Sequence, residues 1–475
     1  MMNLILADVG YYETRAAILE NGRVAEIHFE RTHHRSLVNQ IYLGQVINVL
    51  HSLQTVFLDI GTGHNVFLHE DEMTVPISQV KTGQLLMVQI IKDALDKKGP
   101  KSTMHYSLPG RYLVMLPNQE HVGISNRILK PDERTRLFHL EKTFRPESHH
   151  GIIFRTEAAK QPASTLLKDW KYLTSVWNSI ETMQYHAPGK SLLYSEQSLL
   201  LRLLRDAVNV ETQAFIVNSD SQAQMLQNFC LEFSPDLSNV IESISPDVNP
   251  FNVYHVDEAW KRAMGQQIDL PGGGNIILNH TEAMTTIDVN TAGSKGKQNF
   301  QETAFATNME AVDEIARQLR LRDIGGIILI DFIDMKNKKN HHNLLNHLTL
   351  SLKKDRQKTV VMGFTHLGLV EMTRKRTRHK METLFQEPCR FCSGTGVTQS
   401  VYWSLYEIET AFRRLSVQTD VQSVHLRIHP LRHREFLQAH LDLKHLATVY
   451  GLTLTVFEDE SVPLIEHILS ASSQI

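Results

Sequence analysis

The chain has 475 residues, more than a single hydrophobic core usually holds, which predicts three or more domains. Its 42% apolar and 21% charged residues are typical of a globular protein, and the net charge of −3 excludes a basic surface spread over the whole chain. Any nucleic-acid surface must therefore be local. Three cysteines exclude a disulfide framework and favour a reducing compartment, and no apolar run approaches the roughly 20 residues of a membrane span. We expect a cytoplasmic protein with no membrane span.

The N-terminal part of the chain predicts short strands. Residues 3–30 form two strand-like runs, and Asn21-Gly22 is a hairpin signal between them. Residues 36–95 contain several short apolar runs, which turn residues separate at roughly ten-residue spacing. This second pattern is typical of a small barrel of the OB type.

The middle and the end of the chain mix helix and strand signals. Residues 158–185 and 191–209 predict helices, and residues 205–268 alternate between the two types. The first helix has an apolar stripe made of Leu166, Leu167, Trp170, Leu173, Val176 and Trp177. Residues 398–475 predict a small α/β unit, so the fold class is multidomain, α+β and α/β.

Two acids lie at corresponding places in a predicted β-α-β unit. Asp288 ends one β-branched run, Asp331 ends the next aliphatic run, and a long helical segment separates the two. Such a crossover makes the two strands parallel, so acids at the same strand ends meet in space. Asn290 shares the face of Asp288, because residues i and i+2 of a strand point the same way. Carboxylate and amide oxygens suit Mg²⁺.

A second interpretation of these acids stays open at the level of sequence. They could cap their strands or pair with Arg320 and Arg322 on the intervening helix. Asp334 is a further acid in the same stretch, but its i+3 position places it off the face of Asp331.

Cys389 and Cys392 form a Cys-x-x-Cys pair in a glycine-rich turn, which is half of a structural zinc site. Cys230 stands in an apolar context and fits a buried core thiol. One chain therefore cannot close a four-thiolate site, but two chains could supply one pair each. A redox pair and two idle thiols are the alternatives.

Two further groups fit nucleic-acid contacts. Tyr42, Phe57 and Phe67 lie on barrel strands, where aromatic rings can stack unpaired bases, although at least one ring could instead fill the barrel. Arg155-Thr156 offers a guanidinium and a hydroxyl to a phosphate, but the dipeptide alone proves nothing. The charge run RKRTRHK (374–380) is either a solvated face or a phosphate track.

Three segments together resemble the ribonuclease E/G family of bacterial endoribonucleases. They are TEAMTTIDVNT (281–291), TNMEAVDEIARQLRLRDIGGIILIDFIDM (307–335) and PCRFCSGTG (388–396). The resemblance covers nearly the whole chain, and its length is similar to that of the members without a long disordered tail. It implies a ribonuclease H-like scaffold split between 1–35 and 200–265, an OB-fold RNA-binding domain (36–105), a 5′-monophosphate sensor region (106–199), a DNase I-like catalytic domain (266–385), a zinc-link (386–397) and a small C-terminal domain (398–475).

The resemblance also implies roles for individual residues. Catalysis would use one Mg²⁺ between Asp288 and Asp331, with Asn290 beside them. The zinc-link would join two chains through Cys389 and Cys392, giving a homodimer and possibly a tetramer.

By the same resemblance, Phe57 and Phe67, with Tyr42, would contact RNA. Arg155, Thr156 and Lys358 would bind a 5′-monophosphate. Two differences weaken the expected RNA contact of the barrel: Gln45 stands where a basic residue is expected, and the turn before Phe57 reads HSLQ.

The sequence thus predicts a Mg²⁺-dependent endoribonuclease that cleaves single-stranded, A/U-rich RNA and leaves 5′-phosphate ends. A 5′-monophosphate would stimulate it, and its cellular role would be ribosomal RNA maturation, mRNA decay or both. The alternative is an RNA-binding factor without catalysis, in ribosome assembly or translation. Such a factor has no use for two converging acids and an asparagine.

Overall fold

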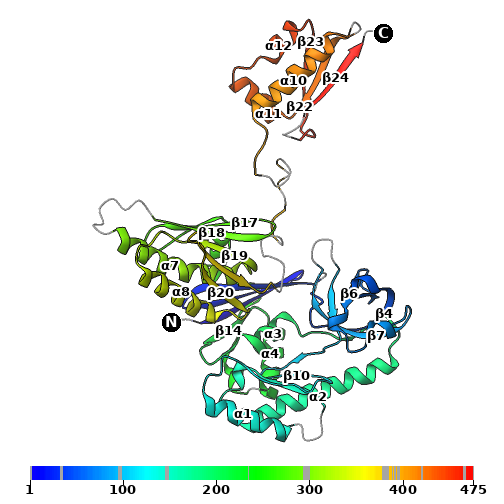
Figure 1. Ribbon diagram of the computed structural model, residues 1–475, viewed down its shortest axis with the longest axis vertical. Coiled ribbons are helices and arrows are strands. Elements are labelled where there is room, and N and C mark those ends of the chain that lie inside the picture. Colours follow the sequence, from blue (N-terminus) through cyan, green and yellow to red (C-terminus); the bar gives the residue numbers. More distant parts are fainter. Residues whose placement is uncertain are drawn as a thin grey trace. The chain divides into compact units, whose positions relative to one another are not determined.

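The computed structural model of the protein consists of two compact units, Met1–Glu382 and Thr383–Ile475 (Figure 1). The residues that the structure describes are 3–32, 36–94, 99–144, 149–233, 235–291, 300–376, 385–387, 389, 392, 396–418, 421–463 and 467–473. Part of the charge run, 377–380, and most of the turn around the cysteine pair lie outside them. No helix in these ranges combines the length and the apolar character that crossing a bilayer requires.

The N-terminal strands share a sheet with a segment about two hundred residues later. Its order is β15-β14-β1-β2-β3, in which β1 pairs with β2 antiparallel and with β14 parallel. The strands are β1 (Leu4–Val9), β2 (Glu13–Glu20), β3 (Arg23–Arg31), β14 (Ala214–Val217) and β15 (Ile241–Ser243). Alternate residues of β1 are buried on opposite faces, because α3 (Leu199–Asp206) and α4 (Asp220–Phe233) cover one face while α5 (Pro250–Val253) and α6 (Val256–Ala263) cover the other.

The predicted barrel is present and closed. Strands β4, β5, β6, β8 and β7 pair in that order, and β7 pairs back to β4, which closes the barrel. They are β4 (Ile41–Leu50), β5 (Thr55–Asp59), β6 (Asn65–His69), β7 (Leu85–Lys92) and β8 (Lys101–Thr103). Figure 1 shows β4, β6 and β7 gathered in this barrel, drawn in blue.

A four-stranded sheet and two helices follow the barrel. The sheet order is β11-β12-β10-β9, and its strands are β9 (Leu108–Pro109), β10 (Leu113–Leu116), β11 (Val122–Ile124) and β12 (Gly151–Phe154). Helices α1 (Pro131–Phe144) and α2 (Ala163–His186) pack on it. The apolar stripe of α2 lies in this core, where Trp177 is fully buried.

The helix expected over 191–209 is only partly correct. Ser191–Tyr194 forms strand β13, which pairs with β4 of the barrel, and the helix α3 begins only at Leu199. The short run SLLY lacks a helical period of its own, and the free edge of β4 gives its backbone groups a partner.

The acidic β-α-β unit lies in a six-stranded sheet of order β16-β17-β18-β19-β21-β20. The strands are β16 (Gln267–Asp269), β17 (Asn275–His280), β18 (Met284–Asn290), β19 (Gly326–Asp331), β20 (Thr359–Phe364) and β21 (Val370–Arg374). Helices α7 (Phe300–Leu321) and α8 (Lys338–Ser351) share a core with one face of this sheet (Figure 1).

The second unit is a small α/β fold. Its sheet order is β23-β22-β24, with strands β22 (Val421–Ile428), β23 (Thr453–Glu458) and β24 (His467–Ser473). Helices α10 (Val401–Ser416), α11 (Pro430–Gln438) and α12 (Leu443–Val449) complete a core in which Ile408, Phe412 and Phe436 are fully buried.

Candidate functional site

Asp288 and Asp331 lie directly side by side. Strands β18 and β19 pair in parallel, and the register places Asp288 opposite Asp331. Neighbouring strands are about 4.8 Å apart, so the two carboxyl groups start from adjacent backbone positions. Both side chains are exposed, whereas Ile287 and Ile330 beside them are buried. The acids therefore lie on the open face of the sheet, opposite α7 and α8.

Local sequence explains why the chain adopts this arrangement. The isoleucines of the two strands alternate into the core, and α7 is the long crossover that a parallel pair needs. Gly326 begins β19 at φ 100°, a backbone conformation that a residue with a Cβ rarely adopts. The Gly325-Gly326 pair thus ends the turn after α7 and starts the strand that carries Asp331.

The acids form an uncompensated negative pair. Burial and the charges of Asp288 and Asp334 raise the pKa of Asp331 above its usual value. The Nδ2 of Asn290 donates to Oδ2 of Asp288 at 2.9 Å, which orients that carboxylate. Among the described residues, no cationic side chain pairs with any of these three acids.

This donor set fits a hard divalent cation. Mg²⁺ commonly binds one or two carboxylates and takes its other ligands from water and substrate phosphate. The described ranges hold no group of three or more His, Cys, Asp or Glu side chains placed to bind a metal, so a metal at this place would have two protein carboxylates as ligands.

The two arginines of the alternative interpretation are bonded elsewhere. Arg320 pairs with Glu26 at 2.8 Å and also with Glu20, both on the N-terminal sheet. Arg322 donates to Oε1 of Gln318 and to the carbonyl of Gly265, each at 2.7 Å. These bonds join α7 to its neighbours and leave the acids open for another cation.

The aromatic residues of the barrel divide into two groups. Phe57 and Phe67 are direct cross-strand partners on β5 and β6, and both are half-buried on the outer side. Tyr42 instead lies inside the barrel, only 6% exposed, and its hydroxyl donates to Oε1 of Gln40 at 2.6 Å. The burial of Tyr42 favours the alternative in which its ring fills the barrel rather than stacks on a base.

Lys101 is a residue that the sequence reasoning did not single out. It stands opposite Phe67 in the register of β6 and β8, and it pairs with Glu72 at 2.6 Å. The basic stretch DKKGPKS (96–102), which contains Lys101, is the only signal in the sequence. Its partner Phe67 belongs to a strand about thirty residues earlier, and only the closed barrel reveals the pairing.

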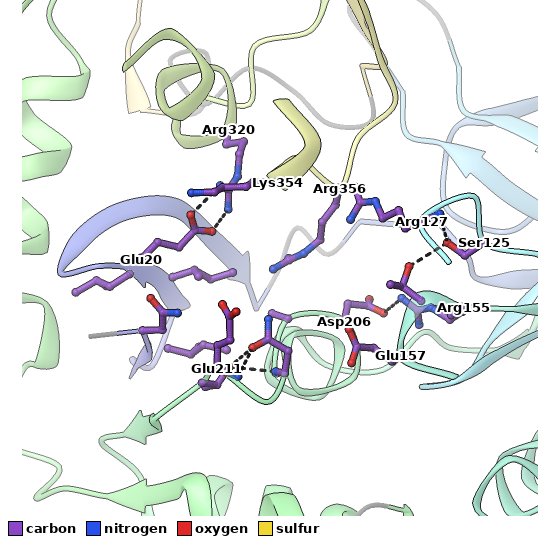
Figure 2. Close-up of a pocket in the computed structure, with 18 of the residues that line it drawn as sticks. Glu20, Ser125, Arg127, Arg155, Glu157, Asp206, Glu211, Arg320, Lys354 and Arg356 are labelled. Carbon is purple, nitrogen blue, oxygen red and sulfur yellow. Dashed lines mark hydrogen bonds and ion pairs between the residues drawn. The ribbon is translucent and has the colours of Figure 1, made fainter. Parts of the chain in front are cut away.

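Arg155 and Thr156 line a cavity of about 620 Å³ (Figure 2). The hydroxyl of Thr156 bonds that of Ser125 at 2.9 Å, and the Nη2 of Arg155 pairs with Asp206 at 2.6 Å. Although burial opposes ionisation of Asp206, Arg205 and Arg155 lower its pKa to about 2. The guanidinium of Arg155 is thus held in a fixed place at the cavity wall.

The other basic residues of the cavity are not the ones that sequence predicts. Lys354 and Arg356 line it with Arg127, as Figure 2 shows. Lys358 is exposed and is not among the lining residues. Every second residue of the KKDRQK segment is basic, so sequence alone could not decide which of them face the cavity.

A buried ion pair connects this cavity to the acidic strand. The Nη2 of Arg127 donates to the carbonyl of Asp355, whose carboxylate pairs with Arg374 at 2.6 Å. Arg374 also donates to Asp323 at 2.8 Å and to the carbonyl of Ile324 at 2.9 Å, in the turn that precedes β19. Breaking a pair this buried costs about 3–5 kcal/mol, so the connection is rigid.

Cys389 is exposed and Cys392 is half-buried. The N–H of Gly396 donates to the Sγ of Cys392 at 3.3 Å. Pro388, Arg390, Phe391 and residues 393–395 lie outside the described residues.

Comparison with known proteins gives a consistent result. Residues 107–377 match the sequence profile of the Ribonuclease E/G family. The chain is 39% identical over 421 residues to proteins named Ribonuclease G from Salmonella typhimurium and from Escherichia coli K12, which covers 85% of this chain and 86% of each relative. It is also 34% identical over 375 residues to a Ribonuclease E from Synechocystis, covering 76% of this chain and 55% of that relative.

The repulsion between the acids is measurable as a titration. Asp288→Asn removes one negative charge beside Asp331, so we expect the pKa of Asp331 to fall towards its usual value in metal-free protein. A carboxyl group whose pKa is higher in the folded than in the unfolded state destabilises the fold as the pH rises between these two pKa values. The free energy of unfolding of the variant should therefore fall less than that of the parent protein over this pH range. Carboxyl ¹³C shifts of labelled aspartate, recorded with chelator present, measure the pKa. An unchanged Asp331 titration would contradict the proximity of the two charges.

Proposed function

The chain belongs to the ribonuclease E/G family, and on that basis we propose that it is an endoribonuclease that hydrolyses single-stranded RNA at Asp288 and Asp331. The observation that carries the proposal is the parallel register that sets these two carboxylates side by side on an open sheet face. A pair of acids without a cationic partner among the described residues suits a divalent ion and the phosphate that it would bind.

The roles of the residues follow from their geometry. Mg²⁺ held by the two carboxylates would polarise the scissile phosphate and lower the pKa of a bound water. Asn290 orients Asp288 through its amide, so that an oxygen of that carboxylate stays directed to the open face. Hydrolysis of this kind leaves a 5′-phosphate on one product and a 3′-hydroxyl on the other.

The barrel is the surface that we propose holds the RNA strand. Phe57 and Phe67 present adjacent, half-exposed rings, and stacking of an unpaired base on an aromatic ring contributes about 1–3 kcal/mol. Lys101 stands beside Phe67, but its ammonium is paired with Glu72, so the two rings carry the proposed contact. Paired bases have no free faces, so this surface favours unpaired RNA, in which A/U-rich segments are common.

The cavity around Arg155 and Thr156 is the proposed site for a 5′-monophosphate. Arg127, Lys354 and Arg356 add positive charge to its lining, and Lys358 remains a further candidate near it. The buried pair of Asp355 and Arg374 joins the cavity wall to the turn before β19. Binding of a 5′-monophosphate in the cavity would act on the strand that carries Asp331 through these bonds. The cellular roles that we propose are ribosomal RNA maturation, mRNA decay or both.

We further propose that two chains share one zinc ion through Cys389 and Cys392, in a dimer that could pair again into a tetramer. The support is chemical: two cysteines with two residues between them, a Cys-x-x-Cys pair, form half of a tetrahedral thiolate site. A cytoplasmic location agrees with free thiols.

Cleavage tests the main proposal. Asp331→Asn should reduce the cleavage of a short 5′-monophosphorylated, A/U-rich RNA by a factor of about 10³ or more, because one of two metal ligands is lost, while RNA affinity stays within about twofold. Gel analysis of products and fluorescence anisotropy measure the two quantities. Asp313→Asn, an acid of α7 that bonds Ser351, is the matched control and should cleave normally. Undiminished cleavage by Asp331→Asn, or by the parent protein in chelator, would refute the metal site.

End recognition is tested separately. Arg155→Ala should remove the preference for RNA with a 5′-monophosphate over RNA with a 5′-hydroxyl, and should leave cleavage of the hydroxyl form unchanged. The measurement is the ratio of kcat/KM for the two RNAs. Arg136→Ala is the control, because Arg136 pairs with Glu133 on α1 away from the cavity. If the parent protein does not distinguish the two ends, this part of the proposal is wrong.

The zinc-link has its own readout. Cys389→Ser should abolish bound zinc and convert dimers into monomers, since tetrahedral zinc needs all four thiolates. Elemental analysis and light scattering measure zinc and mass, and Cys230→Ala, which alters only the buried thiol, should retain both. A parent dimer that contains no zinc would contradict the link.

A further inference from the structure

One buried amide holds the chain that follows the acidic strand. Asn308 lies on α7 and is fully buried. Its Nδ2 donates to the carbonyl of Ile333 at 2.8 Å, and its Oδ1 accepts from the N–H of the same residue at 3.0 Å. A single side chain thus bonds both backbone groups of one residue, because a carboxamide carries both a donor and an acceptor.

The residue that it holds stands between two acids. Residues 332–337 are neither helix nor strand, so Ile333 has no ladder or helix partner, although its side chain packs on the core. Asp331 precedes Ile333 by two positions and Asp334 follows it directly. Fixing the backbone at Ile333 therefore fixes the backbone positions from which the side chains of Asp331 and Asp334 extend.

Two further side chains hold the other end of the same loop. The N–H of Lys336 donates to Oε1 of Gln301 at 2.8 Å, and Nε2 of His341 bonds the carbonyl of Met335 at 2.8 Å. Asp334 thus lies between two hydrogen bonds on its N-terminal side and two on its C-terminal side. Its own carboxylate is exposed and pairs with no cation among the described residues.

We propose that Asn308 is a positioning residue that holds Asp334 beside Asp331, and that Asp334 accepts hydrogen bonds from water on a divalent ion at the Asp288–Asp331 pair. This inference rests on the proposed function of that pair. Asp334 is assigned to the waters because the register sets Asp288 and Asp331 opposite each other, whereas Asp334 lies in the loop beyond the end of β19. Mg²⁺ retains several waters in its protein sites, and a carboxylate beside them orients those waters.

The arrangement of Asn308 and its loop favours a positioning role over a purely structural one. A loop that only had to end β19 needs no exposed acid at its centre and no buried amide to fix it. Burying an amide inside α7 disfavours the helix unless both of its ends are satisfied. Here both ends are used on Ile333, one of the two residues that separate Asp331 from Asp334.

Binding of Mn²⁺ to the full-length protein without RNA tests the inference. Free Mn²⁺, measured by electron paramagnetic resonance, gives the dissociation constant independently of catalysis. Asp334→Asn and Asn308→Ala should each weaken Mn²⁺ binding by about 10-fold, the size expected for groups just outside the metal ligands. The double variant should bind no more weakly than Asp334→Asn alone, because Asn308 acts through Asp334.

Gln318→Ala is the matched control. Gln318 is another buried amide of α7, 2% exposed, and it bonds Glu314 and Arg322 away from the loop. Its replacement should lower the resistance to urea about as much as Asn308→Ala does, yet leave Mn²⁺ binding unchanged. In cleavage assays, excess Mg²⁺ should restore the kcat of Asn308→Ala but leave that of Asp331→Asn low.

Each outcome decides the inference. Unchanged Mn²⁺ binding by Asp334→Asn overturns it, and that exposed variant remains informative even if Asn308→Ala fails to fold. Fully additive effects in the double variant also overturn it. If Asp288→Asn leaves Mn²⁺ binding and cleavage intact, the proposed function itself fails. If Asp288→Asn abolishes both while Asp334→Asn does nothing, only this inference fails.

Discussion

The arrangement depends on the parallel pairing of β18 with β19. That register forces two carboxylates, more than forty residues apart in the chain, into neighbouring positions on one sheet face. Their repulsion opposes the pairing and contributes to the raised pKa of Asp331. The strands nevertheless stay together, because isoleucines on the opposite face are buried against α7 and α8. The core therefore maintains a concentration of negative charge that a divalent ion would neutralise.

The proposed RNA-contacting surfaces belong to other sheets of the same unit. The barrel contributes the adjacent rings of Phe57 and Phe67, and the sheet with α1 and α2 contributes Arg155 and Thr156. A long single-stranded RNA can contact distant surfaces at the same time. Base stacking, end binding and cleavage can therefore be carried out by different sheets of the unit. The buried pair of Asp355 and Arg374 provides a fixed connection between the cavity and the turn before β19.

Most of the helices and strands predicted correctly were predicted from the period of apolar residues and from the length of each segment. The parallel register of β18 and β19 confirms the β-α-β unit. Its signals in the sequence were two apolar runs, the long helical segment between them and the two glycines that end that helix. The small barrel is confirmed as well. The helix expected over 191–209 was wrong at Ser191–Tyr194, because a four-residue strand exists only through its partner β4.

Side-chain direction was harder to predict. Tyr42 points into the barrel, and one step along β4 would have placed it outside, so sequence could not distinguish the two faces. Lys354 and Arg356, rather than Lys358, line the cavity, since their directions depend on a turn that packing determines. Asn308 gave no signal at all: a lone asparagine inside a helix is ordinary until its partner, Ile333, is seen. Such features arise from long-range contacts.

Mapping a bound metal on the protein backbone tests the central claim most directly. Fe²⁺ can replace Mg²⁺ at oxygen sites, and with ascorbate and peroxide it generates hydroxyl radicals that cut the nearest backbone. We predict two principal cuts, near residues 288 and 331, both suppressed by excess Mg²⁺ and both lost in Asp288→Asn. Cuts at other positions, or cuts that Mg²⁺ does not suppress, would contradict a shared metal between these two acids.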